Sequence, residues 1–200
     1  TVNKTTPVAG DVKYVDRNGD GVVDDNDRDI IGNPNPDFTY GFQTKVSWKS
    51  LSLSASFNGV QGRDILNVGN RYNNTPGTKS NNVTRKAFQN MWTDENPSNL
   101  YPKSTFVVQN MVMDRYVEDG SYLRCSDITL SYVLPAKWTN KIGIKNTSVY
   151  ASVKNAFVIT DYSGYDPEVN SFAFDGLRPG VDMNSYPTPR SFVFGLNLTF

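Results

Sequence analysis

The chain has 200 residues, its 20 basic and 20 acidic side chains balance to a formal charge of zero, and it contains no histidine. The balanced charge gives nucleic acid no basic face to bind, so no nucleic acid partner is expected. The absence of histidine removes the commonest general base and zinc ligand, and no pair of carboxylates stands out as an acid and base set. We therefore expect a protein that is not an enzyme and has no catalytic residues. The single cysteine, Cys125, cannot form an internal disulfide and is interpreted as a small apolar filler.

The first motif along the chain is the aspartate-rich stretch "DRNGDGVVDDND", residues 16–27. Read as a twelve-residue calcium loop, it has an oxygen donor at each liganding position, and Gly21 stands at the sixth position, where the sharp turn needs glycine. The donors are the side chains of Asp16, Asn18, Asp20, Asp24 and Asp27 and the carbonyl group of Val22. We expect Ca²⁺ here as a structural ion that stiffens the loop. Mg²⁺ and an acidic turn without a metal remain open, because the last position holds aspartate in place of the usual glutamate.

Alternation of apolar and polar side chains predicts five β-strands. In "FTYGFQTKVSW", residues 38–48, almost every even position is apolar or aromatic, and "LSLSASFNG" resumes the pattern after a tight turn at Lys49 and Ser50. Less regular alternation predicts a second hairpin, and the last run, "RSFVFGLNLTF", is apolar at every second place. The predicted strands are residues 38–48, 51–59, 121–134, 147–158 and 190–200.

The connections between these strands are unequal in length. Two are short, whereas the connections that begin at Val60 and Thr160 run to roughly sixty and thirty residues, and loops of that length are usually functional. A helix-like pattern within the first of them ends near Trp92. Strands of about ten residues, joined alternately by short turns and long loops, are typical of an outer-membrane β-barrel whose outward side chains meet lipid. A soluble sandwich also explains the alternation, but it explains the long loops less well.

Five stretches, taken in order, carry a resemblance to a known family. They are "GDVKYVDRNGDGVVDDNDRDIIGNPNPDFTYGF", "MWTDENPSNLYP", "RYVEDGSYLRCSDITLSYVLP", "NAFVITDYSGYDPEVN" and "SYPTPRSFVFGLNLTF". Over nearly all of its length the chain resembles the C-terminal part of SusC/RagA-type, TonB-linked transporters of the bacterial outer membrane.

The resemblance implies an all-β fold in which these strands are the last part of a large antiparallel barrel, 22-stranded in the family, with long extracellular loops. The plug domain of the family has no counterpart in this chain, so we take the chain as the C-terminal barrel segment. The resemblance also implies import of oligosaccharides or peptides beneath a SusD-like surface lipoprotein that acts as a lid. The missing N-terminal part would contact the TonB complex, and the strands here would meet the remaining barrel strands and outer-membrane lipid.

The end of the chain resembles the signal by which outer-membrane barrels are captured for assembly, because a terminal aromatic residue follows apolar residues at every second position. The residues concerned are Phe192, Phe194, Leu196, Leu198 and Phe200. An amphipathic last strand without a signal function is the alternative. If Phe200 lies at the periplasmic side, the short turns are periplasmic and the long connections are extracellular.

Aromatic side chains in the long connections are candidates for contact with a substrate or with the lipoprotein lid. They are Tyr72, Trp92, Tyr101, Tyr162, Tyr165 and Tyr186. The alternative is that these rings pack within the loops themselves. For the chain as a whole, the alternative is a soluble, calcium-stabilised carbohydrate-binding or adhesin module, which would need a polar outer face on its last strand.

Overall fold

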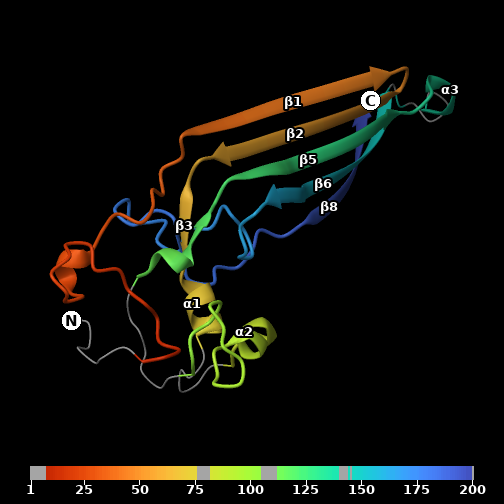
Figure 1. The fold of residues 1–200 in the computed structure, drawn as a ribbon. Coiled ribbons are helices and arrows are strands. Elements are labelled where there is room, and N and C mark those ends of the chain that lie inside the picture. Colours follow the sequence, from red (N-terminus) through yellow and green to blue (C-terminus); the bar gives the residue numbers. More distant parts are fainter. Residues whose placement is uncertain (1–7, 76–81, 105–111, 140–143, 145, 200) are drawn as a thin grey trace.

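The computed structural model describes residues 8–75, 82–104, 112–139, 144 and 146–199. Figure 1 shows a long, twisted sheet with most of the short elements and long loops gathered at one end and the short connections, one of which contains a short helix, at the other. The strands are β1 (Phe38–Trp48), β2 (Leu51–Gln61), β3 (Asp64–Asn67), β4 (Val117–Asp119), β5 (Tyr122–Val133), β6 (Asn146–Thr160), β7 (Val181–Asp182) and β8 (Ser191–Thr199). The helices are α1 (Val68–Asn74), α2 (Arg85–Asn90) and α3 (Ala136–Thr139), with 3-10 turns η1 (Asp25–Asp27) and η2 (Asp114–Tyr116). Within the described residues, no helix has the length and apolar character needed to cross a membrane.

Five strands form an antiparallel sheet in the order β1-β2-β5-β6-β8, and we call it the main sheet. The strands β4, β3 and β7 form a small second sheet, in which β3 pairs with β4 antiparallel and with β7 parallel. In the part of the chain that the structure describes, β1 and β8 are the edges of the main sheet. An exposed edge strand presents unpaired backbone groups that can pair with a further strand.

The register of the main sheet separates apolar from polar side chains. One row across all five strands joins Val46, Leu53, Leu130, Ala151 and Phe194. Because successive side chains of a strand point to opposite sides, this row and its equivalents define one face of the sheet, which we call the apolar face. The equivalent rows are Trp48, Leu51, Tyr132, Val149 and Leu196; Thr44, Ala55, Ile128, Val153 and Phe192; and Phe42, Phe57, Cys125 and Phe157.

The opposite side of the main sheet, which we call the polar face, carries mainly hydroxyl, amide and charged groups. Its rows are Ser47, Ser52, Ser131, Tyr150 and Gly195; Lys45, Ser54, Thr129, Ser152 and Val193; Gln43, Ser56, Asp127, Lys154 and Ser191; and Gly41, Asn58, Arg124 and Val158.

Two bulges interrupt the regular pairing of the sheet. β5 has one extra residue, Ser126, relative to β2, and β6 in turn has one residue more than β5 at the same level. The backbone of Asn155 in this part of β6 has a φ of 51°. A bulge changes which side of the sheet the following side chains face. As a result Cys125 lies on the apolar face and Arg124 on the polar face.

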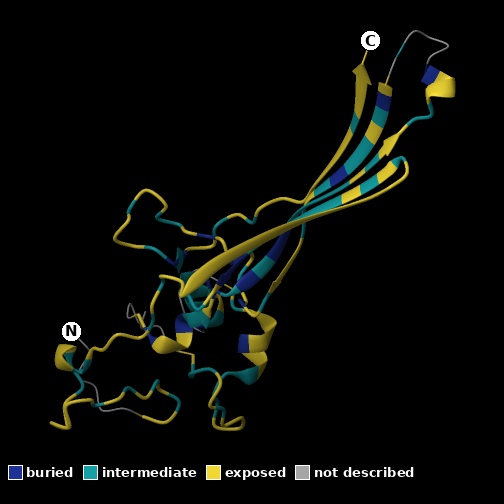
Figure 2. Ribbon diagram, turned by 90° about the horizontal axis from the view of Figure 1, so that it is seen from above, coloured by how far each residue is buried: buried dark blue, intermediate teal, exposed yellow. Residues whose placement is uncertain are grey.

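The buried core lies at the loop end of the molecule and not under the main sheet. Ile65 of β3 forms a hydrophobic cluster with Tyr162 and Val169 of the connection between β6 and β8. Figure 2 shows that buried residues gather in this region, whereas β1 is exposed along its whole length. The loop cluster is therefore the packed part of the chain, and the main sheet extends away from it.

The five predicted strands correspond to β1, β2, β5, β6 and β8, and their ends differ by at most two residues among the residues described. The helix-like pattern near Trp92 corresponds to α2. The sequence prediction does not include β3, β4, β7, α1 or α3. Each of these elements has seven residues or fewer, too short for a periodic pattern to be recognised.

Candidate functional site

The apolar face of the main sheet is open over most of its area in the described part of the chain. Phe194 is 79% exposed and Trp48 is 68% exposed, although both lie in regular strands. Soluble proteins rarely expose an apolar patch larger than a few hundred Å², because burial of each Å² of apolar surface would stabilise the protein by roughly 25 cal/mol. A face of this extent therefore calls for an apolar environment.

Aromatic rings form a band across the apolar face towards its loop end. The rings of Phe42 and Phe57 stack with their centroids 4.5 Å apart, and Phe57 lies 6.3 Å from Phe157 across β5. Cys125 stands between the last two in the register and is fully buried, which fits its interpretation as a small filler. Trp48 marks the turn end of the same face. Aromatic bands at both ends of an apolar surface are typical of strands that face lipid.

The polar face has an ion pair near its middle that is also hydrogen-bonded. Lys154 Nζ lies 2.6 Å from Asp127 Oδ2, and the hydroxyl groups of Ser152 and Thr129 each donate to the same carboxylate at 2.8 Å. The Thr129 and Ser152 hydroxyls also contact one another at 2.9 Å. These groups are satisfied among themselves and suit a hydrated or polar surrounding, which is the opposite requirement to that of the apolar face.

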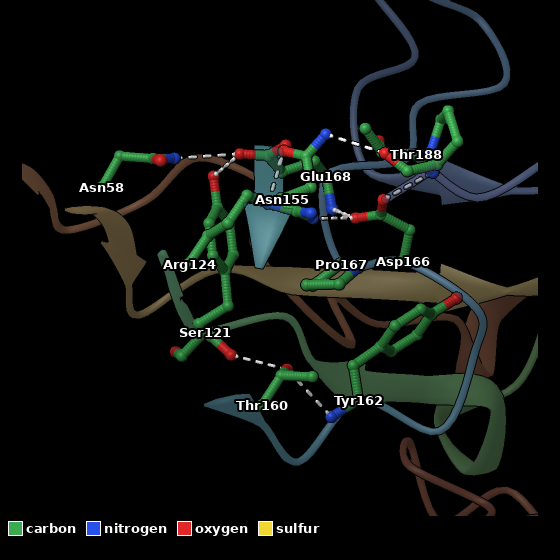
Figure 3. A network of polar contacts seen from close by, with 12 residues as sticks. Asn58, Ser121, Arg124, Asn155, Thr160, Tyr162, Asp166, Pro167, Glu168 and Thr188 are labelled. Atoms are coloured by element: carbon green, nitrogen blue, oxygen red, sulfur yellow. Dashed lines mark hydrogen bonds and ion pairs between the residues drawn. The ribbon is translucent and has the colours of Figure 1, made fainter. Parts of the chain in front are cut away.

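At the loop end of the polar face, the connection between β6 and β8 folds back onto the main sheet, as Figure 3 shows. The side chain of Arg124 in β5 is 6% exposed and pairs with Asp166 at 2.5 Å. Its Nε also lies 3.2 Å from Glu168 Oε2, close enough for ion pairing although not aligned for a hydrogen bond. Glu168 Oε1 accepts hydrogen bonds from the Tyr122 hydroxyl at 2.6 Å and from Asn58 Nδ2 at 3.0 Å. Three side chains of the sheet thus hold two carboxylates of the connection.

Asp166 also ties the two ends of this connection together. Its Oδ1 accepts from the amide of Glu168 and its Oδ2 from the amide of Thr188, both at 3.0 Å. Burial opposes the charge on Asp166, but these donors and the Arg124 guanidinium outweigh it and hold the pKa of the carboxyl below its ordinary value. The group is therefore ionised at neutral pH, and Pro167 beside it is fully buried.

The aspartate-rich loop, residues 16–27, closes on its own backbone. Asp16 accepts hydrogen bonds from the amides of Gly19 at 2.7 Å and Gly21 at 2.8 Å. These two glycines have φ values of 74° and 83°, which lie in the left-handed region that favours glycine. Asp27 accepts from amides at both ends of the loop, which holds the pKa of its carboxyl below the ordinary value, the amide of Asp24 contributing most.

The other expected metal donors of this loop also make local hydrogen bonds. Asn18, Asp20 and Asp24 each accept from the amide two residues further on, at 2.8 Å. Within the described residues, no three acidic, histidine or cysteine side chains are gathered as they would be around a metal ion. The Val22 amide donates to Asp20. The loop therefore contains the oxygen atoms for a metal but holds them against backbone amides, and metal binding stays a prediction.

The predicted contact residues of the β6–β8 connection fall into two groups. Tyr162 is buried in the loop core, and its hydroxyl donates to Asp182 at 2.7 Å, so its ring packs within the loops. Burial and this carboxylate raise the pKa of Tyr162 above its ordinary value. Tyr165 is exposed and Tyr186 is 89% exposed, so both rings are available to a ligand or partner.

The three predicted contact residues of the longer connection are half-buried. The ring of Tyr72 lies beneath the Arg71 guanidinium at 4.9 Å. The amide of Trp92 donates to the carbonyl of Tyr101 at 3.0 Å, which brings these two residues together, and the Trp92 ring packs against Gly10. These side chains help to organise the loops, and each keeps part of its surface open.

The predicted assembly residues share one face of β8. Phe192, Phe194, Leu196 and Leu198 are all exposed on the apolar face, whereas Phe200 lies outside the described residues. β8 is also an edge of the main sheet. In the part of the chain that the structure describes, the strand thus combines an apolar row with an unpaired edge, and its role as an assembly signal stays a prediction.

Sequence reasoning did not find the cluster around Arg124. A charged residue within an alternating strand was one available signal, and the acidic pair of Asp166 and Glu168 in a long connection was another. Neither signal shows which groups meet, because Arg124 and Asp166 are 42 residues apart.

A comparison with models of protein families finds no match. Individual relatives do match. The TonB-dependent receptor P26 of Formosa agariphila is 35% identical over 201 residues, which cover 96% of this chain and 20% of that protein. The TonB-dependent receptor SusC of Bacteroides thetaiotaomicron is 34% identical over 194 residues, or 94% of this chain and 17% of that protein.

Solved structures give the same result. The RagAB peptide importer in its "closed-closed" state superposes on this chain with a TM-score of 0.73 at 28% identity, over 86% of this chain and 18% of that chain. The "open-open" state gives a TM-score of 0.70 at 29% identity. The chain spans about a fifth of the length of the relatives it matches, and these relatives are receptors and transporters, not enzymes. The chain belongs to the SusC/RagA family of TonB-dependent receptors.

Proposed function

We propose that this chain is the C-terminal barrel segment of a TonB-dependent importer in the outer membrane of a bacterium. The observation that carries the proposal is the two-faced main sheet, which has a continuous apolar face on one side and hydroxyl and charged groups on the other. Lipid outside and a polar interior satisfy both faces at once.

The dimensions of the strands support a membrane-spanning role. β1 has 11 residues. At a rise of about 3.3 Å per residue it extends about 33 Å, and a tilt of about 40° reduces its height to about 25 Å, the thickness of the apolar band of outer-membrane barrels. The free edges at β1 and β8 are where the remaining barrel strands would pair, 22 in all in the family. The plug domain and the TonB-contacting segment would lie in the part of the protein beyond this chain.

The loop cluster at one end of the sheet is where we place substrate entry. Relatives of this kind include one named a peptide importer. We propose that the whole protein imports an oligosaccharide or a peptide beneath a SusD-like surface lipoprotein, and that Tyr165 and Tyr186 contact one of these. Both rings are exposed on the loops, and aromatic rings can stack on sugars or anchor a protein interface.

The alternative of a soluble, calcium-stabilised binding module is less well supported. Such a module would bury the apolar face of the main sheet against a second layer. Phe192 and Phe194 instead stand exposed on that face, and the packed core lies in the loops.

Membrane placement can be tested with fluorescent probes on neighbouring residues of β2. In the full-length protein with Cys125→Ala, an environment-sensitive dye is attached at Leu53→Cys on the apolar face or at Ser54→Cys on the polar face. In lipid vesicles, nitroxide-labelled lipids should quench the probe at position 53 and leave the probe at position 54 nearly unchanged. Equal quenching at the two positions, or none at either, would refute a lipid-facing apolar face.

We further propose that the loop at residues 16–27 takes up Ca²⁺ as a structural ion, with Mg²⁺ as the alternative. The spacing of its oxygen donors supports this, because the carboxylates of Asp16, Asp20 and Asp24 keep further lone pairs for an ion while they accept from backbone amides. Calorimetry on the full-length protein should give a calcium signal that Asp16→Ala and Asp20→Ala abolish. No heat at millimolar calcium or magnesium would contradict the metal assignment.

A further inference from the structure

The connection between β6 and β8, residues 161–190, is held against the rest of the chain near both of its ends, and we call it the strap. At its start, the amide and the hydroxyl of Ser163 both donate to the Glu118 carboxylate of β4 at 2.9 Å. Near its C-terminal end, β7 pairs with β3, and the amide of Leu66 donates to the Gly180 carbonyl at 2.8 Å. Near its N-terminal end, residues 166–168 lie against the polar face of the main sheet. A loop fixed at both ends is a defined structural element and not a free segment.

The fixed point on the main sheet depends on charge. The side chains of Arg124 and Asp166 are both at most 6% exposed, so either charge would be buried without its counterion if the other were removed. Glu168 adds a second carboxylate, and an Arg63 guanidinium nitrogen donates to the Pro167 carbonyl. Among the described residues the strap adds few apolar contacts, namely those of the fully buried Pro167 and of Tyr162 and Val169 in the hydrophobic cluster.

The middle of the strap contributes little to holding it in place. Phe174 and Leu177 at its tip are essentially fully exposed, and the tip is braced locally by an ion pair between Asp175 and Arg178 at 3.3 Å. The position of the strap over the sheet is thus set by its ends and above all by the charged cluster.

We propose that the strap is a fixed constriction at the loop end of the polar face, and that Arg124, Asp166 and Glu168 form the latch that holds it there. The inference rests on the proposed function, because the polar face lines a passage only if the sheet is part of a barrel. Release of the latch lets residues 166–168 leave the polar face, while β7 stays paired with β3, and enlarges the opening. Arg124 is then a positioning residue, which acts on transport through the strap without touching the substrate.

Amide hydrogen exchange on the full-length protein directly measures how often the latch opens. The amides of Glu168 and Thr188 donate to Asp166, so their exchange reports separation of the strap from this carboxylate. Asp166→Asn removes one charge of a buried pair, which should speed exchange at both amides about a hundredfold. Glu168→Gln alters a group whose side chain is 34% exposed and keeps its shape, so it should give an increase of about tenfold and remain folded if Asp166→Asn does not.

The matched control is Asp127→Asn, which breaks a different ion pair of the polar face, with Lys154. The contacts that the structure describes for the Asp127 side chain are with residues of β5 and β6 and not with the strap. Exchange at Glu168 and Thr188 should not change in this variant. Unchanged exchange in both latch variants would overturn the latch, and equal acceleration in the control would overturn its specificity.

The constriction is tested separately in cells, by entry of a bulky antibiotic that the intact outer membrane excludes. Latch variants should admit it and the Asp127→Asn control should not. Faster exchange of the strap without antibiotic entry would overturn the constriction and leave the latch standing. If the protein is not an outer-membrane importer, antibiotic entry is unaffected in every variant and the probe experiment on β2 also fails, which separates that result from failure of the latch alone.

Discussion

A single charge on the apolar face gives the sharpest test of how the main sheet is placed. Ala55 lies on that face of β2, in the row with Ile128 and Val153, and the row is close to the middle of the strand. Ala55→Arg removes no apolar contact of consequence and adds a long cationic side chain. If the row lies near the bilayer midplane, the change should cost about 2–4 kcal/mol of unfolding free energy. Since about 1.4 kcal/mol corresponds to a factor of ten, the folded-to-unfolded ratio should fall by roughly 30-fold to 1000-fold.

Two matched variants separate the effect of charge from that of size and position. Ala55→Met adds bulk without charge and should cost much less, because an apolar side chain remains in an apolar surrounding. Ser56→Arg places the same cation on the polar face next to Asp127, where it should be close to neutral. The assay is denaturant unfolding of the full-length protein in lipid vesicles, with the midpoints compared at equal slope. Equal midpoints for Ala55→Arg and Ser56→Arg, or a lower midpoint for Ser56→Arg, would refute the orientation of the sheet.

Three further predictions follow from individual contacts. Gly195→Ala places a methyl group about where the Tyr150 ring lies, so it should lower the unfolding midpoint, and Tyr150→Ala should relieve the clash in the double variant. Tyr162→Phe removes the hydroxyl that donates to Oδ2 of the buried Asp182, which keeps the Ser185 amide on Oδ1, and should make the loops more sensitive to protease. Tyr186→Ala should leave protease resistance unchanged and alter uptake. The pKa of Asp166 is lower in the folded protein than the ordinary value of about 3.9. The ionised carboxylate therefore contributes its full stabilisation of the folded state above that ordinary value, and this contribution is lost as the pH falls through the lower pKa of the folded protein. Exchange of the strap amides, corrected for intrinsic rate, should therefore be constant from pH 7 to 5 and rise only in stronger acid, and a rise near pH 6 would contradict this.

The strands of the main sheet can be predicted from sequence because their pattern is local. β1 alternates over 11 residues, and its apolar set from Phe38 to Trp48 appears in the structure on one face as the pattern requires. The bulge at Ser126 cannot be read in the same way, because an extra residue is recognised only against the register of neighbouring strands. The second sheet is likewise built from pairings between short segments far apart in the chain, such as Leu66 with Val181.

The same distinction between local patterns and long-range contacts applies to the candidate site. The oxygen donors of the aspartate-rich loop are local, so sequence spacing finds them, but whether a carboxylate such as Asp16 faces an ion or the amide of Gly21 depends on rotamers that spacing does not determine. The cluster around Arg124 depends on contacts across 42 residues or more. Exposure is also a tertiary property, which is why Tyr162 and Tyr165 look equivalent in sequence although one is buried and the other is exposed.

The bulge at Ser126 connects the membrane-facing part of the sheet to the strap. On the turn side of the bulge, even-numbered residues of β5 such as Ile128 lie on the apolar face; on the loop side, odd-numbered residues such as Cys125 do. Without the extra residue, Arg124 would lie on the apolar face, where an unpaired guanidinium carries a large desolvation cost. With it, Arg124 reaches Asp166 on the polar face while β5 keeps an apolar row on the other side along its whole length. One inserted residue therefore lets a single strand meet two opposing requirements, an unbroken apolar surface outside and a buried charge inside.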